Sequence, residues 1–235
     1  MYNATDLSTT DVLILCGGLG TRFRSISGGG QKILVELAGK AFIDILIESI
    51  LSFGSRRFIL CVGHERDRVK EHFKNKNLEV VFSEENECLG TGGAVKNAMP
   101  YVESSPFLVL NGDSLCTIDY GQFFKFHQQK RGLLSIVLTK PLPETDYGVI
   151  DIDGNYRIIS FQEKAKNHKG NYINAGIYLL NHEVFQLMPK ANKISLEYDF
   201  IPRVITNGCY GFVTERELTD IGTPERYRRA KIIIT

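Results

Sequence analysis

Apolar runs and helix-like segments alternate through the first half of the chain. The run 12–16 (VLILC) is continuously apolar, as is typical of parallel strands buried on both faces, and the mostly apolar runs 57–62 (RFILCV) and 106–111 (PFLVLN) are expected to be further strands. Segment 41–54 instead carries apolar residues at helical spacing and ends near Gly54. The other expected elements of this half are helices at 65–73 and 94–99, a strand at 78–83 and a loop at 84–93. This alternation predicts an α/β, Rossmann-like fold of three layers, with a mostly parallel central sheet.

The pattern changes after a further apolar run at 133–139. Segment 148–164 predicts a hairpin whose turn is Asp153-Gly154-Asn155. A strand at 171–180, a short helix near 182–188 and a closing helix at 224–234 follow. Because no linker or repeat divides the chain, we expect residues 1–235 to form one domain, with 1–10 a poorly ordered extension. The mixed strands of the second half are expected to insert over the ligand-binding edge of the sheet.

Composition excludes several classes of protein. Apolar residues make up 43% of the chain, charged residues 23%, and the net charge is +1, which favours neither nucleic acid nor a membrane surface as partner. No apolar run reaches the roughly 20 residues of a membrane span, and the polar N-terminus does not resemble a signal peptide. We therefore expect a soluble, cytoplasmic protein. The five cysteines form no CxxC pair and are expected to be buried free thiols: Cys16, Cys61, Cys88, Cys116 and Cys209.

The glycine-rich stretch after the first apolar run, GGLGTRFRSISGGGQK, suggests phosphate binding. It lacks the third glycine of a dinucleotide fingerprint, and GGGQKI lacks the last position of a P-loop. A looser loop, whose backbone N–H groups and cations Arg22 and Lys32 face phosphates, remains. A plain surface turn is the alternative when the stretch is read alone.

Charged residues elsewhere favour the phosphate interpretation. Asp113 follows an apolar strand in NGDSL, where open α/β sheets keep their ligand sites, and Asp220 precedes the last helix in TDIG. Two converging carboxylates commonly hold Mg²⁺ beside phosphates, although each alone could be a cap or a turn residue. Glu163 and Lys164 end a predicted hairpin strand, where a surface ion pair is the simpler interpretation.

Eight motifs follow one another from Val12 to about Ile233: GGLGTR, a later lysine, LGTGGA, NGD, YG, EK, NAGIY and DIGTPERY. In this order they resemble the sugar-1-phosphate nucleotidylyltransferase family, most closely its heptose 1-phosphate guanylyltransferases and, more distantly, its mannose 1-phosphate guanylyltransferases. The family usually places its loop lysine in P-K-P, whereas this chain has Gln31-Lys32-Ile33. Because proline fixes backbone conformation, we expect the loop that presents Lys32 to be looser here.

The resemblance implies a nucleotidyltransferase fold and the transfer of a nucleoside monophosphate from a nucleoside triphosphate to a sugar 1-phosphate, with Mg²⁺ as cofactor. It implies that Arg22 and Lys32 are catalytic and that Asp113 and Asp220 hold the metal. The nucleotide-binding residues implied are Cys16, Gly17, Gly18, Gly20, Thr21, Glu85, Gly90, Thr91 and Gly112. The sugar phosphate-binding residues implied are Gly148, Glu163, Lys164 and Asn174.

Glu85 stands where relatives place a base-reading side chain. A carboxylate can accept both donors of guanine's pairing edge, so we expect GTP, with CTP or UTP as alternatives. A phosphate oxygen is already an anionic nucleophile, so no catalytic histidine is required. We expect all five histidines at the surface: His64, His72, His127, His168 and His182.

Other functions fit less well. A non-catalytic sensor should have lost one of the four charged site residues, a glycosyltransferase should carry a D-x-D motif, and an oxidoreductase needs the missing fingerprint. The exact sugar and the oligomeric state are open, with a homodimer among the options.

Overall fold

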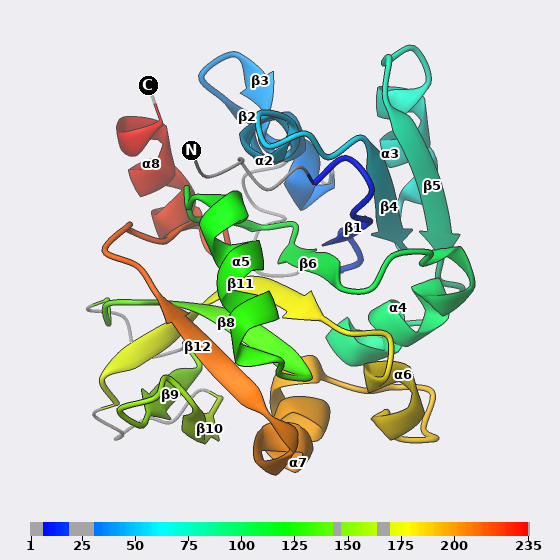
Figure 1. Ribbon diagram of the computed structural model, residues 1–235. Helices are drawn as coiled ribbons and strands as arrows, with labels where there is room; N and C mark the ends of the chain where they lie inside the picture. The colour runs from blue at the N-terminus through cyan, green and yellow to red at the C-terminus, as the bar shows by residue number, and fades with distance from the viewer. Residues whose placement is uncertain (1–6, 19–30, 143–146, 164–169, 235) are drawn as a thin grey trace.

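The computed structural model describes residues 7–18, 31–142, 147–163 and 170–234. Its centre is a nine-stranded sheet flanked by helices on both faces (Figure 1). Four parallel strands lie in the order β6-β1-β4-β5. Their bounds are Phe107–Asn111 for β6, Val12–Leu15 for β1, Arg57–Val62 for β4 and Glu79–Glu84 for β5.

The mixed strands extend this same sheet. Strand β11 runs antiparallel to β6 on one edge and to β8 on the other, and β9, β10 and β12 continue from there. Their bounds are Leu134–Thr139 (β8), Val149–Ile152 (β9), Ile158–Gln162 (β10), Tyr172–Leu180 (β11) and Cys209–Val213 (β12). The inserted mixed β region expected from the sequence is therefore present, and it joins the parallel strands directly through the pairing of β11 with β6.

Two short pairs of strands complete the β structure. Strand β2 (Glu36–Leu37) pairs with β3 (Lys40–Ala41), and β7 (Ser114–Leu115) pairs with β13 (Thr219–Asp220). The second pair lies beside the carboxyl end of β6 and, as described below, brings two carboxylates together.

Alternate residues of the parallel strands face two separate cores. Val12, Ile14 and Leu60 belong to one core, whereas Leu13 and Ile59 belong to the other. The first core is covered by α2 (Phe42–Leu51), α3 (Arg66–Phe73), α5 (Tyr120–Lys130) and α8 (Pro224–Ile233). The second is covered by α4 (Gly90–Ala98), α6 (Val184–Leu187) and α7 (Ile201–Val204). The predicted three-layer α/β fold with a mostly parallel central sheet is therefore confirmed.

Short turns of other helix types link these elements: η1 (Lys32–Leu34), η2 (Met99–Tyr101) and η4 (Ile205–Asn207) are 3₁₀, and η3 (Leu196–Phe200) is π-helical. The sequence pattern had not singled out α5, η3 or β12. It had also placed Gly90–Gly93 in a loop, whereas these residues form the first turn of α4.

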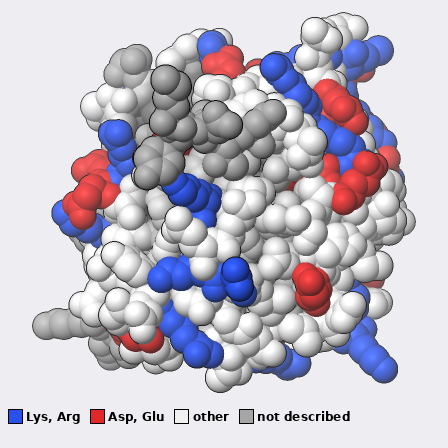
Figure 2. Space-filling model, viewed as in Figure 1, with Lys and Arg blue, Asp and Glu red and all other residues white. Residues whose placement is uncertain are grey.

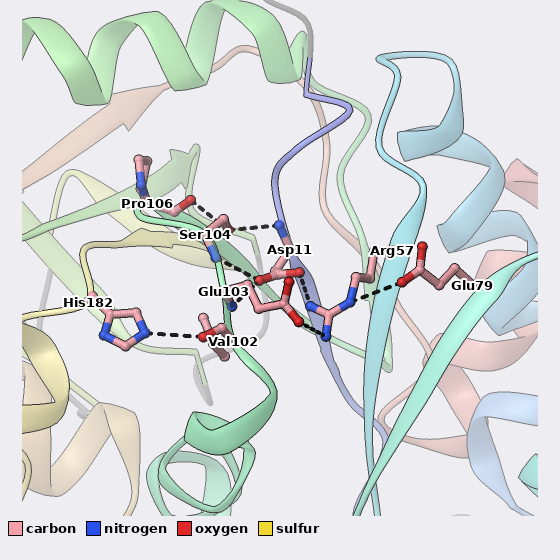
Figure 3. A network of polar contacts seen from close by, with 8 residues as sticks. All are labelled: Asp11, Arg57, Glu79, Val102, Glu103, Ser104, Pro106 and His182. Carbon is pink, nitrogen blue, oxygen red and sulfur yellow. Dashed lines mark hydrogen bonds and ion pairs between the residues drawn. The ribbon is translucent and has the colours of Figure 1, made fainter.

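The amino-terminal ends of the parallel strands are fastened by a polar network around Asp11, whose side chain is 4% exposed (Figure 3). Its carboxylate pairs with Arg57 and accepts the N–H groups of Glu103 at 2.6 Å and Ser104 at 2.8 Å. Residues 7–10 pack nearby and do not form the loose extension expected there, since Leu7 is 2% exposed and its N–H donates to the Phe53 carbonyl. Residues 1–6 lie outside the described residues.

The face of the molecule seen in Figure 2 carries basic and acidic side chains scattered among uncharged ones, in keeping with a net charge of +1. Among the described residues, no helix is long and apolar enough to cross a membrane.

Candidate active site

The carboxyl ends of β1 and β6 meet at one point of the sheet edge. The N–H of Gly112, just after β6, donates to the Leu15 carbonyl at 3.1 Å. A Cβ on Gly112 would lie 2.6 Å from that carbonyl oxygen, so only glycine allows this approach. Gly112 is buried and lines neither of the cavities described below, but it brings Asp113 into the same cavity wall as Gly17 and Gly18, which follow β1.

The two aspartates converge through the β7–β13 pair. Asp220 pairs with Ser114, and the N–H of Ile221 donates to the Asp113 carbonyl at 2.9 Å. The Asp220 carboxylate accepts the N–H of Gly222 at 2.8 Å, pairs with Arg226 at 3.5 Å and accepts the Tyr147 hydroxyl. The Asp220 carboxylate is thus fixed by three partners: Gly222, Arg226 and Tyr147.

Asp113 is more open and is paired with a different cation. Its side chain is 45% exposed, and its Oδ2 lies 2.6 Å from Nζ of Lys32. Among the described residues, no group of three or more His, Cys, Asp or Glu side chains could hold a metal. Two carboxylates still fit a hard divalent ion that takes its remaining ligands from substrate phosphates and water, as Mg²⁺ usually does.

Lys32 is firmly presented despite the missing prolines. Gln31 has φ −59° and ψ 125°, a conformation that proline would also adopt, and its buried side chain donates to the His64 carbonyl. Ile33 is 3% exposed and belongs to the first core. The expectation of a looser segment was therefore wrong for residues 31–34, where a hydrogen bond and a buried side chain replace the two rings.

Two cavities open along this edge and share four wall residues: Leu15, Gly17, Gly18 and Thr91. The first, of about 500 Å³, is lined by Cys16, Lys32, Asp113, Asn174 and Asp220, among others. The second, of about 440 Å³, is lined by His64, Arg66, Glu85, Gly90 and others. A ligand that spans both cavities would pass Gly17 and Gly18, which are exposed.

Glu85 has the most unusual environment of the second cavity. It is 9% exposed, and its Oε2 accepts the N–H of Leu89 at 3.3 Å, while its Oε1 is buried without a hydrogen-bond partner. A Cβ on Gly17 would lie 2.9 Å from that Oε1, so only glycine fits at position 17 against the carboxylate. Burial raises the pKa of the Glu85 carboxyl, and the Leu89 hydrogen bond partly opposes this shift.

The glycines of α4 permit close packing against segment 192–196. A Cβ on Gly90 would lie 2.6 Å from the Ile194 carbonyl oxygen, and one on Gly93 would lie 2.7 Å from that of Asn192. This is the physical reason that LGTGGA begins a helix here instead of forming an open loop. The consequence is that Thr91, in the first turn, lies between the two cavities.

On the other side of the first cavity, β9, β10 and β11 bring three predicted residues together. The N–H of Asn174 donates to the Gly148 carbonyl at 2.9 Å. A Cβ on Gly148 would lie 2.5 Å from Oε2 of Glu163. Asn174 lines the first cavity, whereas Gly148 and Glu163 do not. Four predicted site residues fall outside the described residues: Gly20, Thr21, Arg22 and Lys164.

Several residues at the site were not found from the sequence. Arg226 pairs with Asp220 and lies over the Tyr147 ring, 4.5 Å from its centroid. The sequence feature that could have revealed Arg226 is its place in the first turn of α8, because this helix starts at the Thr223 cap, close in sequence to Asp220. The other cavity-lining residues missed include Gln31, Arg66, Asn111 and Ser114.

The histidine and cysteine expectations need correction at two residues. His127 is 2% exposed, contacts Ser135 at 2.8 Å, and has a pKa lowered by burial, so it is a core residue. Cys88 is exposed, while the other four cysteines are buried, and all five are free thiols. His168 lies outside the described residues.

Comparisons with known proteins agree with this geometry. The sequence profile of the Nucleotidyl transferase family matches residues 11–235, and the chain belongs to this family. It is 32% identical to the D-glycero-alpha-D-manno-heptose 1-phosphate guanylyltransferase of Aneurinibacillus thermoaerophilus, over 94% of this chain and 96% of that protein. It is also 35% identical to mannose-1-phosphate guanyltransferase 2 of Candida glabrata, over 92% of this chain but 62% of that protein.

Among solved structures, HddC from Yersinia pseudotuberculosis complexed with GMP-PN is similar with a TM-score of 0.84. Its sequence is 37% identical, and the match covers 96% of this chain and 100% of that one. The protein is therefore a sugar-1-phosphate nucleotidylyltransferase, an enzyme of a family that typically uses a divalent metal.

Proposed function

We propose that this enzyme transfers GMP from GTP to a heptose 1-phosphate, D-glycero-D-manno-heptose 1-phosphate, and releases pyrophosphate with Mg²⁺ as its cofactor. The observation that carries the proposal is the unpartnered, buried Oε1 of Glu85 in the wall of the second cavity. A buried polar atom without a partner is costly unless a ligand satisfies it. The GMP-PN complex of the similar HddC supports guanine as that ligand.

Guanine fits a carboxylate better than the other bases do. Its pairing edge presents two adjacent donors, N1–H and N2–H, and a carboxylate has only acceptors. Cytosine and uracil place an acceptor at O2, which would face the same carboxylate unfavourably. The triphosphate would then run past Gly17 and Gly18 toward Lys32 and the two aspartates in the first cavity.

The reaction requires charge neutralisation and alignment more than proton transfer. A phosphate oxygen of the sugar attacks the α-phosphorus in line, and pyrophosphate leaves. Lys32 faces the α-phosphate and Asn174 the sugar, while Asp113 and Asp220 hold the metal, which offsets phosphate charge when bound. From the family resemblance of the sequence, we assign Arg22 to the leaving pyrophosphate and Lys164 to the sugar phosphate.

The sugar is proposed from the relatives. The match with this chain covers nearly the whole length of the heptose 1-phosphate guanylyltransferases, whereas it covers 62% of the mannose enzyme of Candida glabrata. Mannose 1-phosphate is therefore the second candidate. We place the reaction in the cytoplasm, in one catalytic domain, with the product used for surface polysaccharide synthesis.

A screen of pyrophosphate release tests the proposal. It crosses GTP, ATP, CTP and UTP with heptose, mannose, glucose and N-acetylglucosamine 1-phosphates. We expect the highest kcat/KM with GTP and the heptose, and no turnover without a divalent metal. A wild type that prefers another triphosphate or another sugar would contradict that part of the proposal.

The variant Glu85→Gln tests the base directly. One hydrogen bond to guanine survives and the other becomes donor against donor, at a cost of about 1–3 kcal/mol, so kcat/KM for GTP should fall roughly ten- to a hundredfold. UTP, whose edge alternates acceptor and donor, should lose nothing. The matched control is Glu87→Gln, an exposed carboxylate that lines the same cavity, which should leave the ranking unchanged. An unchanged ranking in Glu85→Gln would remove Glu85 from base recognition.

A further inference from the structure

A bulge in β11 brings two of its polar side chains together. Asn174 pairs with Leu138 of β8 and Tyr178 with Ile136, so four steps along β11 match two along β8. Gly176, between them, has φ +73° and could not carry a side chain, because a Cβ would lie 2.8 Å from Nδ2 of Asn111. Residues four apart on a regular strand lie too far apart to bond, whereas here Nδ2 of Asn174 donates to the Tyr178 hydroxyl at 2.7 Å.

The amide of Asn174 is fixed by these contacts. Its Oδ1 accepts the N–H of Gly176 at 2.9 Å, while its Nδ2 is bound to Tyr178. One N–H of the amide group and one acceptor position of Oδ1 remain for a ligand in the first cavity. Tyr178 itself is fully buried and lines neither cavity, so its hydroxyl acts only on its protein neighbours.

Glu197 receives the next hydrogen bond of this chain. The Tyr178 hydroxyl donates to its Oε1 at 3.3 Å. Its Oε2 accepts the hydroxyls of Thr91 at 2.7 Å and of Ser195 at 2.8 Å. Glu197 stands in the π-helical turn η3, a type of turn that is frequent at functional sites. Thr91 in turn accepts the N–H of Leu196 at 2.8 Å, which locks its hydroxyl as a donor to Glu197.

We propose that Tyr178 and Glu197 are positioning residues that fix Asn174 toward the sugar 1-phosphate and tie it to Thr91 beside the nucleotide. The proposal rests on the proposed function of the two cavities. The continuous path from Asn174 through Tyr178 and Glu197 to Thr91 begins at the wall of the first cavity and ends at the wall shared by both. Each substrate therefore binds against a side chain whose orientation depends on the same carboxylate.

The direction of the hydrogen bonds is stable over the working pH range. Burial raises the pKa of the Tyr178 phenol well above its ordinary value, and the carboxylates of Glu197 and Glu163 raise it further. The phenol thus stays protonated and remains the donor to Glu197. Because the hydrogen of the phenol is donated to Glu197, the phenol oxygen can only accept a hydrogen bond from Asn174. Asn174 must therefore turn its NH₂ group toward Tyr178, and this fixes the orientation of its amide.

The variant Tyr178→Phe removes only the hydroxyl and tests the proposal with GTP and the sugar 1-phosphate that the screen prefers. We expect the KM for the sugar 1-phosphate to rise about tenfold, because the hydrogen bond that orients Asn174 is lost, with the KM for GTP changed less than threefold. Glu197→Gln, at a half-buried position, should raise both KM values, because Thr91 and Tyr178 both donate to it. The control is Tyr120→Phe, an equally buried phenol that lines neither cavity, which should change neither KM.

A double-mutant cycle separates positioning from general destabilisation. If Tyr178 acts through Asn174, then Tyr178→Phe adds less than twofold to the sugar KM of Asn174→Ala. Additive effects, or an unchanged sugar KM in Tyr178→Phe, would overturn the proposal. A wild type that prefers another triphosphate or sugar would contradict the proposed substrates, and the same cycle run with that pair still decides the network.

Discussion

Glu85 is held away from water while one of its oxygens lacks a partner. Such an arrangement costs stability, because burial disfavours the charged form and raises the pKa of the carboxyl. Strained or unsatisfied groups of this kind are common where a ligand completes the site. The position therefore allows a trade between stability and function to be measured.

We predict that Glu85→Gln is more stable than wild type at pH 7. For an acid whose pKa is raised in the folded state, the penalty is present above the folded pKa and disappears as the pH falls below the unfolded pKa, about 4.3. The difference in Tm between variant and wild type should therefore be largest near neutral pH and vanish below about pH 4. Thermal unfolding across this range checks it. A variant less stable than wild type at pH 7 would show that the carboxylate contributes a structural contact.

Lys32 and Asp113 form an ion pair, although each is assigned to a different ligand group. The ammonium group lies 2.6 Å from Oδ2 of the carboxylate that we propose as a metal ligand, so Lys32 and a metal ion would compete for Asp113. If Asp113 is the metal ligand that we propose, Lys32 would give up Oδ2 to the metal, and a phosphate would offer the ammonium group a new partner.

Removal of this competitor should separate metal binding from catalysis. We predict that Lys32→Met binds Mn²⁺ several-fold more tightly than wild type in the absence of nucleotide, while kcat falls by about 10² or more through the lost cation. Asp113→Asn should lose both metal affinity and activity. Electron paramagnetic resonance titration of free Mn²⁺ measures the first effect and pyrophosphate release the second. Unchanged Mn²⁺ affinity in Lys32→Met would show that Lys32 does not occupy a metal position.

At the scale of elements, close backbone contacts decide the shape of the site. Helix α4 approaches segment 192–196 through its glycines, and the N–H of Gly93 donates to the Ile194 carbonyl at 3.0 Å. This contact places the Thr91 hydroxyl within hydrogen-bond distance of Glu197, in the wall that the two cavities share.

We predict that Gly93→Ala destabilises the protein by about 1–3 kcal/mol and raises both substrate KM values. Alanine favours a helix by about 1 kcal/mol, but its Cβ would lie 2.7 Å from the Asn192 carbonyl oxygen, and overpacking against backbone outweighs that gain. Chemical denaturation and steady-state kinetics measure the two effects. The control is Gly154→Ala, where a Cβ meets nothing within 4 Å, and a change there as large as in Gly93→Ala would refute the argument.

Continuous elements could be predicted from the sequence, and contacts between short or irregular elements could not. The apolar run at 12–16 and the stripe at 41–54 correspond to β1 and α2, because buried strands and amphipathic helices leave periodic patterns. The rule that parallel strands share a ligand-binding edge was enough to expect Asp113 there. The β7–β13 pair has only two residues in each strand, too few for a pattern, and so Arg226 was missed.

The same limit explains the errors in LGTGGA and around Lys32. Glycines usually indicate loops, but in α4 they are required by a neighbour about 100 residues away in sequence, as the Gly93–Ile194 contact shows. Likewise, no local signal tells that Gln31 reaches the His64 carbonyl. Both depend on tertiary contacts, which override local propensity.

At the scale of the whole molecule, the two ends of the parallel strands differ in the residues that they bring together. The carboxyl ends carry the cavities, whereas the amino-terminal ends carry the Asp11 network, where Arg57 also pairs with Glu79 at 3.2 Å and Glu103 at 2.9 Å (Figure 3). The network joins β1, β4, β5 and the segment that leads into β6. Its position suggests a role in stability that is independent of catalysis.

We predict that Asp11→Asn lowers the free energy of unfolding by about 3 kcal/mol or more while kcat/KM stays within twofold of wild type at temperatures where the variant is folded. The loss is large because an amide cannot accept two N–H groups and the Arg57 guanidinium as the buried carboxylate does. The matched control is Glu79→Gln, which removes another partner of Arg57 whose side chain is 63% exposed, and should cost less than about 1 kcal/mol. Urea denaturation with the pyrophosphate assay on the same samples measures both quantities. A stable Asp11→Asn protein with reduced kcat/KM would show instead that the far end of the sheet is coupled to the site.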